Sequence, residues 1–133
     1  MLSILLVEDY LIFAGVVVRL LNRLEDMEVV AVVNTAEDAL RKLLHQKFDL
    51  VIVDVSLPKM NGINLVSLIY NQYPSLPCLM LSGHAHTHYV KRALAAGARG
   101  YILKDSSSGI IEGIRRVVKG EVYVSPELRN HNE

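Results

Sequence analysis

Each of four short apolar runs in this chain is followed directly by side chains that can do chemistry. In chain order these are Glu8 with Asp9, Asp54, Ser82 and Lys104. Carboxylates are ligands for hard divalent cations, and hydroxyl and ammonium groups can contact the oxygens of a phosphoryl group. Each residue is ordinary alone, but their shared position at the ends of apolar runs predicts phosphoryl chemistry at one site.

Three carboxylates brought within a few ångströms must be neutralised. A like-charge pair 4 Å apart costs about 4 kcal/mol at an effective dielectric constant near 20, and a bound cation or a raised pKa removes that cost. We expect Mg²⁺, with Asp9 and Asp54 as direct ligands and Glu8 binding directly or through water. The backbone carbonyl of Ser56, just past the strand, is the fourth ligand that we expect from the protein.

Asp54 is the best candidate for a nucleophile that forms an acyl phosphate. It ends the most apolar run, Leu50 to Val53, which is typical of a rigid central strand. Lys104 would supply a point charge to the transferring group, and Ser82 would donate a hydrogen bond to a phosphoryl oxygen. Taken singly, an Asp or Lys after a strand is usually a cap or a solvated charge, so the prediction depends on all of them together.

The segments that must position these residues alternate between short apolar runs and longer runs of helical period. The predicted strands are 3–7, 28–33, 50–53, 78–81 and 100–103, and the predicted helices are 10–24, 36–46, 63–72, 86–96 and 107–119. This alternation indicates βαβ units with a parallel sheet. In such sheets ligands bind beyond the carboxyl ends of the strands, which is where the chemical residues fall.

Composition limits the class of protein. A chain of 133 residues, 51% hydrophobic and with zero formal net charge, is a single globular domain without the basic excess of a nucleic-acid or membrane-surface binder. Its one cysteine, Cys78, excludes an internal disulfide and is expected to be a buried apolar residue. We find no signal peptide and no apolar run of transmembrane length, so we expect a cytoplasmic protein without membrane contact.

The first predicted helix is apolar over most of its circumference. The stripe expected to face the sheet consists of Phe13, Val17, Leu20 and Leu24. A second apolar face is expected from Leu11, Ala14 and Val18. Such a helix has either a second partner, which would make the chain a homodimer, or scattered surface aliphatics.

Five separated motifs, in order, resemble the receiver domain of bacterial two-component response regulators. They are residues 4–9 (ILLVED), 53–62 (VDVSLPKMNG), 79–83 (LMLSG), 96–101 (AGARGY) and 103–104 (LK). The resemblance implies a CheY-like fold, that is, an α/β flavodoxin-like (βα)5 doubly wound parallel sheet with strand order 2-1-3-4-5.

The resemblance also implies roles for individual residues. Asp54 is similar to the phosphoacceptor, Glu8 and Asp9 to the Mg²⁺-binding pair, and Lys104 to the phosphate-contacting lysine. Ser82 and Tyr101 match the hydroxyl and aromatic switch residues. The implied donor is a sensor histidine kinase. The module would be a signalling domain rather than an enzyme, catalysing only its own phosphorylation and dephosphorylation.

Residues 105–108 (DSSS) and 120–128 (GEVYVSPEL) resemble the LuxR/NarL-type subfamily, whose members continue into a DNA-binding helix-turn-helix domain. We therefore expect a receiver domain over 1–120 and the start of a linker over 121–133, with DNA bound only by an output domain outside this chain. Asp105 stands where many receivers have proline, which leaves the geometry of the Lys104–Asp105 peptide open.

Alternatives remain at this stage. The chain could be a stand-alone receiver that acts by protein–protein interaction, or an Mg²⁺-dependent phosphatase with an Asp nucleophile, although the second acid that such enzymes carry is replaced by Ser56. A homodimer could use the first helix or the face of helix four, strand five and helix five. Ser56 and His84 are candidates for tuning the phosphoryl lifetime. Alternating His84, His86 and His88 could ligate a transition metal, but a solvated loop is the simpler interpretation.

Overall fold

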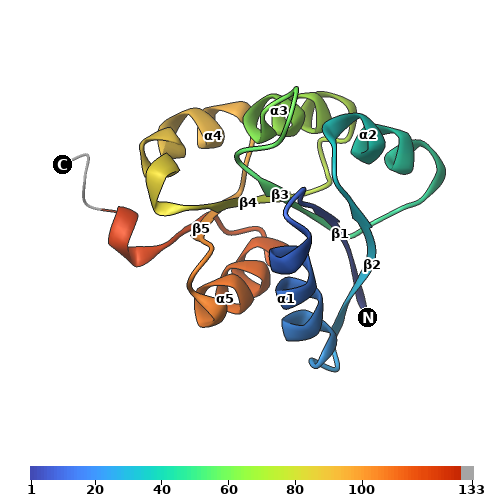
Figure 1. Ribbon diagram of the computed structural model, residues 1–133, viewed down its shortest axis with the longest axis horizontal. Coiled ribbons are helices and arrows are strands. Elements are labelled where there is room, and N and C mark those ends of the chain that lie inside the picture. Colours follow the sequence, from blue (N-terminus) through green and yellow to red (C-terminus); the bar gives the residue numbers. More distant parts are fainter. Residues whose placement is uncertain (130–133) are drawn as a thin grey trace.

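The computed structural model describes residues 1–129 as a parallel sheet between two layers of helices (Figure 1). The strands are β1 (Leu2–Val7), β2 (Met27–Val33), β3 (Leu50–Asp54), β4 (Cys78–Ser82), β5 (Gly100–Leu103) and β6 (Tyr123–Val124). Their order is β2-β1-β3-β4-β5-β6. The predicted fold and the order of the first five strands are confirmed. The sixth strand was not predicted, because two residues carry no periodic signal.

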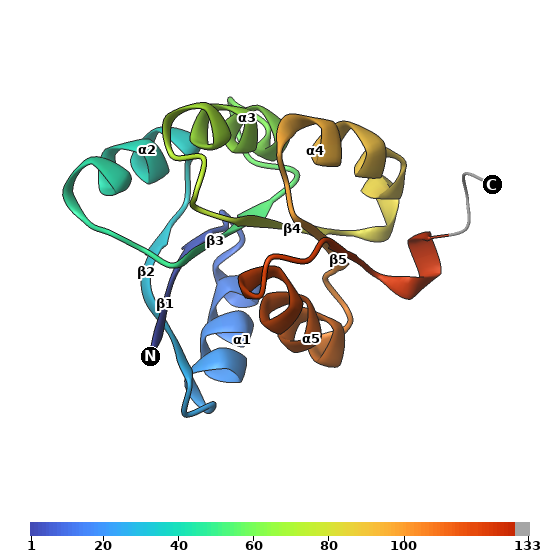
Figure 2. The same ribbon diagram turned by 180° about the vertical axis from the view of Figure 1, so that it is seen from behind.

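The helices cover both faces of the sheet. They are α1 (Leu11–Asn22), α2 (Ala36–His45), α3 (Gly62–Gln72), α4 (Val90–Ala96) and α5 (Ser107–Val118). Helices α2, α3 and α4 lie on one face, and α1 and α5 on the other, as both views show (Figures 1 and 2). No helix within residues 1–129 combines the length and apolar character needed to cross a bilayer.

Successive side chains of the central strands point to opposite faces of the sheet and so contribute to two separate hydrophobic cores. In β3, Val51 and Val53 belong to the core under α2, α3 and α4, whereas Leu50 and Ile52 belong to the core under α1 and α5. All five residues of β3 are buried, and so are all five of β4. A strand covered on both faces reads as a continuous apolar run, which is why β3 was recognisable in the sequence.

The register of the strands brings their carboxyl ends to one edge. Val7 pairs with Val53, Asp54 with Leu81, and Ser82 with Leu103. The residues that follow β1, β3, β4 and β5 therefore lie in neighbouring positions.

Local hydrogen bonds and glycines mark where the helices begin and end. The Thr35 hydroxyl accepts a hydrogen bond from the Asp38 N–H at 3.1 Å and so caps the start of α2. Gly97 and Gly120 follow helices in the left-handed region, with φ of 115° and 94°. Glycine adopts this conformation without the strain that a Cβ would add, and it is the usual residue after a helix.

Helix α4 is shorter than predicted. A 3₁₀ segment, His84–Tyr89, precedes it and contains a kink at His86, with φ of −118° and ψ of 18°. The His86 carbonyl accepts a hydrogen bond from the Tyr101 hydroxyl at 2.5 Å instead of continuing an α-helical ladder. The prediction of a helix from residue 86 was wrong because this long-range contact is not visible in local periodicity.

The faces of α1 also differ from the prediction. Ala14, assigned to the second face, is buried against the sheet together with Val17 and Leu21. Leu11 and Ile12 are its most exposed apolar residues, with 74% and 70% of their surfaces accessible, and Val16 follows at 41%. The outer apolar surface of α1 is therefore centred on its first turn and extends to Val16.

Candidate functional site

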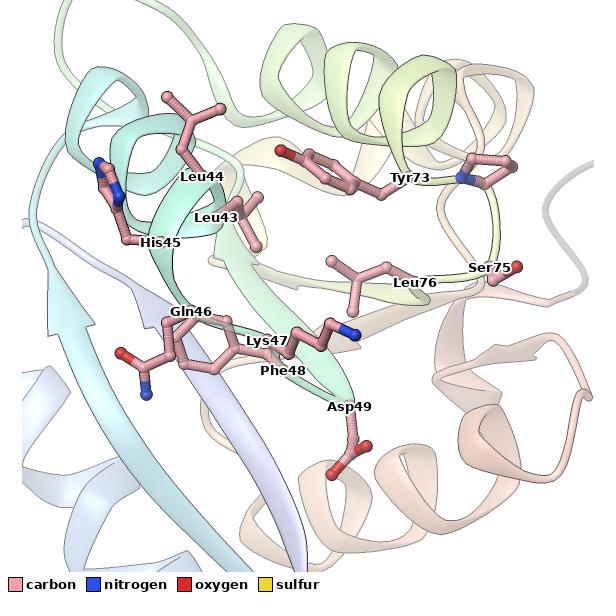
Figure 3. A pocket seen from close by; sticks show the side chains of 11 residues that line it. Leu43, Leu44, His45, Gln46, Lys47, Phe48, Asp49, Tyr73, Ser75 and Leu76 are labelled. Atoms are coloured by element: carbon pink, nitrogen blue, oxygen red, sulfur yellow. The ribbon is translucent and has the colours of Figure 1, made fainter.

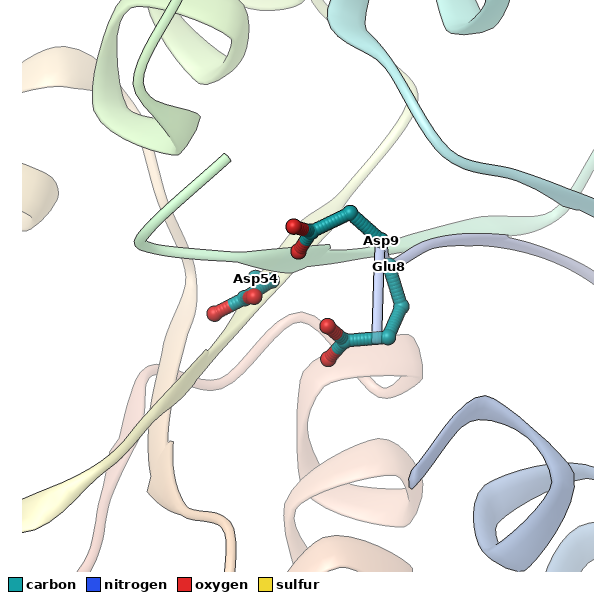
Figure 4. Close-up of side chains that lie close together, drawn as sticks. All are labelled: Glu8, Asp9 and Asp54. Carbon is teal, nitrogen blue, oxygen red and sulfur yellow. The ribbon is translucent and has the colours of Figure 1, made fainter. Parts of the chain in front are cut away.

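Glu8, Asp9 and Asp54 converge at the carboxyl edge of the sheet (Figure 4). One carboxylate oxygen from each lies within 4.8 Å of the others. Glu8 is fully buried, Asp54 is 3% exposed, and Asp9 is exposed. The cluster is thus closed on the side of the sheet and open to solvent beside Asp9.

Lys104 completes the cluster from the end of β5. Its Nζ lies 3.0 Å from Glu8 Oε1 and 3.2 Å from Asp54 Oδ2. The same ammonium lies 4.8 Å from the centre of the Phe13 ring, a cation–π distance. One cation from β5 therefore bridges acids that follow β1 and end β3.

The pKa values in the cluster follow from burial and crowding. Burial, together with the hydrogen bond and negative charge of Asp54, raises the pKa of Glu8 to about 7. Burial alone would lower the pKa of Lys104, but the charge of Asp54 and the hydrogen bond and charge of Glu8 outweigh it, so the net shift is upward. Lys104 therefore stays charged, and Glu8 is the acid that a further cation would help to ionise.

Backbone groups orient the two buried acids. The Tyr10 N–H donates to Glu8 Oε2 at 3.1 Å, and the Ser56 N–H donates to Asp54 Oδ1 at 3.2 Å. These bonds leave Glu8 Oε1 and Asp54 Oδ2 directed towards Lys104.

Gly62 was not predicted to support the site. A Cβ at Gly62 would lie 2.1 Å from the carbonyl oxygen of Asp54, so only glycine fits there. Its N–H donates to the Val55 carbonyl at 2.8 Å, which anchors the start of α3 against the end of β3. An Asn-Gly pair such as Asn61-Gly62 is a turn signal in a sequence, and it does not show that a backbone atom lies this close.

Ser82 and Tyr101 form a second polar group beside the acids. Both side chains are fully buried. The Ser82 hydroxyl donates to the Gly83 carbonyl at 2.8 Å and accepts from the Tyr101 hydroxyl at 3.2 Å. Tyr101 thus connects β5 to the loop that follows β4.

The donor set fits a hard divalent cation. Its ligands are all oxygens, and Glu8 Oε1 is buried without a well-aligned hydrogen-bond donor. Lys104 Nζ is 3.0 Å from Glu8 Oε1, so the negative charge of this oxygen is paired, but the oxygen accepts no well-aligned hydrogen bond. Among residues 1–129 these acids are the one group of at least three side chains placed to share a metal ion; the alternating histidines do not form another.

His84 takes a different position from the acids. Its Nε2 lies 2.8 Å from Asp105 Oδ2, and both side chains are two-thirds exposed, at 66% each. The described part of the chain contains no cis peptide, so Lys104 and Asp105 are joined by a trans bond. The Ser56 N–H contacts Asp54, but no contact of the Ser56 carbonyl with the acidic cluster is seen, so the role of this carbonyl as a metal ligand stays a prediction.

Two hollows in the surface lie outside the acidic cluster. One hollow, of about 590 Å³, lies at the opposite edge of the sheet, where Phe48 and Leu76 precede β3 and β4 (Figure 3). A smaller hollow of about 330 Å³ lies beside the end of β3 and is lined by Ser56, Asn61 and Arg92 among others. Cys78 is buried, and its pKa is raised to about 12 by desolvation, so it is not a reactive thiol.

The family model for the response regulator receiver domain matches residues 4–115. Two curated relatives illustrate the similarity. The chain is 31% identical to the transcriptional regulatory protein DegU of Brevibacillus brevis over 98% of its own length, and 33% identical to the oxygen regulatory protein NreC of Staphylococcus epidermidis over 96%. It spans only 56% of DegU and 59% of NreC.

Solved structures agree in fold. A LuxR-family two-component response regulator from Aurantimonas sp. SI85-9A1 superposes with a TM-score of 0.91 at 28% identity, covering 96% of this chain and 92% of that one. The signal receiver domain of the putative regulator NarL from Mycobacterium tuberculosis gives 0.83 at 26% identity, covering 90% and 98%. The predicted similarity to LuxR/NarL-type receivers is confirmed.

Proposed function

The chain belongs to the response regulator receiver domain family, and on that premise we propose that it takes a phosphoryl group onto Asp54 from a sensor histidine kinase. The observation that carries this proposal is the setting of Asp54. It is a nearly buried carboxylate at a strand end, with two further acids on one side and Lys104 Nζ 3.2 Å away on another.

The transfer would be a single displacement at phosphorus. One oxygen of Asp54 forms a bond to phosphorus while the bond to the donor's imidazole nitrogen breaks. The electron pair of that bond stays with the nitrogen, and the aspartate becomes an acyl phosphate. Lys104 holds a fixed positive charge beside the receiving oxygen, where it can pair with the oxygens of the incoming phosphoryl group, over which the charge of the transition state is spread. Hydrolysis reverses the change when water displaces the aspartate from phosphorus.

Glu8, Asp9 and Asp54, with the carbonyl of Ser56, would hold Mg²⁺. When bound, the ion supplies neutralisation of the phosphoryl oxygens. The buried Glu8 and its raised pKa support this assignment, because a divalent charge favours its ionised form. Ser56 and His84 remain candidates for tuning how long the phosphoryl group persists.

Ser82 and Tyr101 would report the phosphoryl group to the rest of the molecule. A phosphoryl oxygen is a stronger acceptor than the Gly83 carbonyl that Ser82 now contacts, so the hydroxyl would turn towards it. This rotation of the Ser82 hydroxyl would shift the equilibrium between conformations of the surface formed by α4, β5 and α5. That face, or the exposed first turn of α1, would carry a homodimer.

In the whole protein, the output would be transcription. Support comes from DegU and NreC, which are named as regulators and exceed this chain in length. The receiver would occupy residues 1–120 and a linker would begin at 121, with DNA bound only by a separate domain. The proposal includes a cytoplasmic location, as the sequence predicted, and no contact with membrane.

Incubation with a small acyl-phosphate donor and Mg²⁺, followed by intact-mass measurement, tests the proposal. We expect one labile phosphoryl adduct in the natural chain and in Asp26→Asn, a control acid far from the cluster, and none in Asp54→Asn. An adduct that persists in Asp54→Asn would disprove the assignment. Release of many phosphate equivalents per chain at an enzyme-like rate would favour a phosphatase.

A further inference from the structure

The segment Tyr123–Arg129, here called the strap, returns along the free edge of β5. Its first two residues form β6, with Gly100 paired to Tyr123 and Tyr101 to Val124. The segment then turns through a short 3₁₀ element, Pro126–Leu128, beyond the β5 edge, with α4 on one side and α5 on the other (Figures 1 and 2). A segment expected to begin a linker is therefore packed on the domain.

Polar contacts attach the strap to β5. The Tyr123 N–H donates to the Arg99 carbonyl at 2.9 Å, and the Ser125 N–H donates to the Tyr101 carbonyl at 3.0 Å. In the other direction, the Leu103 N–H donates to the Ser125 hydroxyl at 3.0 Å. Ser125 is 2% exposed, so its N–H and hydroxyl form hydrogen bonds with the protein and not with water. An edge strand left without them would expose unpaired backbone groups.

An apolar anchor adds to these bonds. Leu128 is 6% exposed and belongs to the same buried cluster as Tyr101 and Leu103. Removing this apolar side chain from water stabilises the docked position of the strap. At the end of the strap, Arg129 Nε donates to the Val124 carbonyl at 2.7 Å while its guanidinium carbon lies 4.9 Å from the centre of the Tyr123 ring. The strap is thus attached to the domain by apolar burial as well as by hydrogen bonds.

Tyr101 belongs to both the strap interface and the phosphoryl side of the domain. Its backbone carbonyl accepts from Ser125, whereas its one hydroxyl hydrogen is shared between the Ser82 hydroxyl oxygen and the His86 carbonyl. Its ring is fully buried between these two sets of contacts. The backbone of Tyr101 is thus bound by the strap and its side chain by the segment after β4, so this one residue connects the two.

We propose that the β5 edge is a docking surface for the strap, and that phosphorylation of Asp54 tightens this docking through Ser82 and Tyr101. The inference rests on the proposed function. The Ser82 oxygen already accepts from Tyr101 while its hydrogen goes to the Gly83 carbonyl. A phosphoryl oxygen is a stronger acceptor than that carbonyl, so a Ser82 hydroxyl that donates to it is more polarised and accepts more strongly from Tyr101, which favours the buried position of Tyr101. By linkage, the strap in turn favours the phosphorylated state by the same factor.

Hydrogen exchange of single amides tests the coupling. The reporters are the amides of Tyr123, Ser125 and Leu103, and the amide of Leu2, which donates to Asp26 at the far edge of the sheet, is the internal control. Exchange is measured with Mg²⁺ alone and with an excess of acyl-phosphate donor, while intact mass gives the phosphorylated fraction of each sample. We expect the reporters to exchange about fivefold more slowly when phosphorylated, with Leu2 unchanged.

Tyr101→Phe is the matched variant, because it keeps the buried ring and removes the hydroxyl that contacts Ser82. We expect its reporter amides to respond less than about twofold to phosphorylation. A normal adduct on the natural chain with unchanged or faster reporter exchange would overturn the inference and leave the proposed function intact. The absence of any adduct would defeat both.

Leu128→Ala tests the reciprocal effect, with Val122→Ala as its control because Val122 is 59% exposed and lies just before β6. Loosening the strap should lower the phosphorylated fraction at a limiting donor concentration, and Val122→Ala should not. Equal fractions in the two variants would contradict the coupling. If Leu128→Ala does not fold, the comparison of the natural chain with Tyr101→Phe decides.

Discussion

Lys104 Nζ lies 3.2 Å from Asp54 Oδ2 and is shared with Glu8, whose Oε1 is 3.0 Å away. Glu8 is fully buried and the Lys104 side chain is 24% exposed. One ammonium thus balances two carboxylates in a place where water reaches only one side. The ion pair of Lys104 with the two acids therefore joins β5 to β1 and β3, and it also surrounds Asp54, the proposed phosphoacceptor.

Lys104→Met should cost both stability and phosphorylation. Removing one partner of a buried ion pair leaves an uncompensated charge, and we expect a loss of about 3 kcal/mol in the free energy of unfolding by urea denaturation at pH 8 without Mg²⁺. Phosphoryl uptake from an acyl phosphate should fall by at least about tenfold, because the charge beside the receiving oxygen is gone.

The double variant Glu8→Gln with Lys104→Met separates these two effects. A neutral amide removes one of the two uncompensated charges and leaves that of Asp54, so part of the lost stability should return while phosphoryl uptake stays low. The exposed Lys119→Met serves as a control for loss of a lysine. If Lys104→Met proves as stable as Lys119→Met, the ion pair does not have the energetic role described here.

Gly62→Ala should destabilise the end of β3. The new Cβ would lie 2.1 Å from the Asp54 carbonyl oxygen, a backbone atom that cannot move aside cheaply. We expect a loss of about 1–3 kcal/mol by urea denaturation and slower phosphorylation of a displaced Asp54.

Gly15→Ala is the matched control. Gly15 lies inside α1, and the nearest atom to its new Cβ would be Arg19 Nη1 at 3.7 Å, an ordinary contact. Alanine in a helix interior should stabilise by about 1 kcal/mol. A Gly62→Ala protein that gained stability in the same way would show that the close approach to Asp54 has no cost.

Mg²⁺ should raise the melting temperature of the natural chain. A ligand that binds only the folded state adds about 2.7 kcal/mol at a concentration one hundred times its dissociation constant. Asp9→Asn should weaken this response, since Asp9 is the acid of the cluster that is open to solvent. Thermal unfolding over a Mg²⁺ titration measures both, with Asp26→Asn as control. An equal response in Asp9→Asn would remove Asp9 from the ligand set.

His84 should titrate above its usual range. The hydrogen bond and charge of Asp105, with a smaller contribution from Glu127, raise the pKa of His84. Because the folded pKa is raised, the pair stabilises the fold fully below about pH 6.5, and this contribution is lost as pH rises through the folded pKa. NMR titration of the ring should give a midpoint that falls markedly in Asp105→Asn and less in Glu127→Gln. Identical midpoints in all three proteins would mean that the contact is not formed in solution.

Local patterns were sufficient for the order of elements. Strands β1, β3, β4 and β5 are apolar because both of their faces are covered, and caps such as Thr35 end or begin helices by local hydrogen bonds. The boundaries failed where a distant contact decided them, as at His86, whose carbonyl is taken by Tyr101.

From the sequence alone it followed that Glu8, Asp9, Asp54, Ser82 and Lys104 stand at strand ends, and hence that they share an edge, because parallel strands point the same way. Only the tertiary structure decided which of them touch. The 3.2 Å approach of Lys104 to Asp54, the need for glycine at position 62 and the strap over Tyr101 all depend on side chains packed between segments far apart in the chain. Such packing is set by the whole core at once, so no local pattern of residues records it.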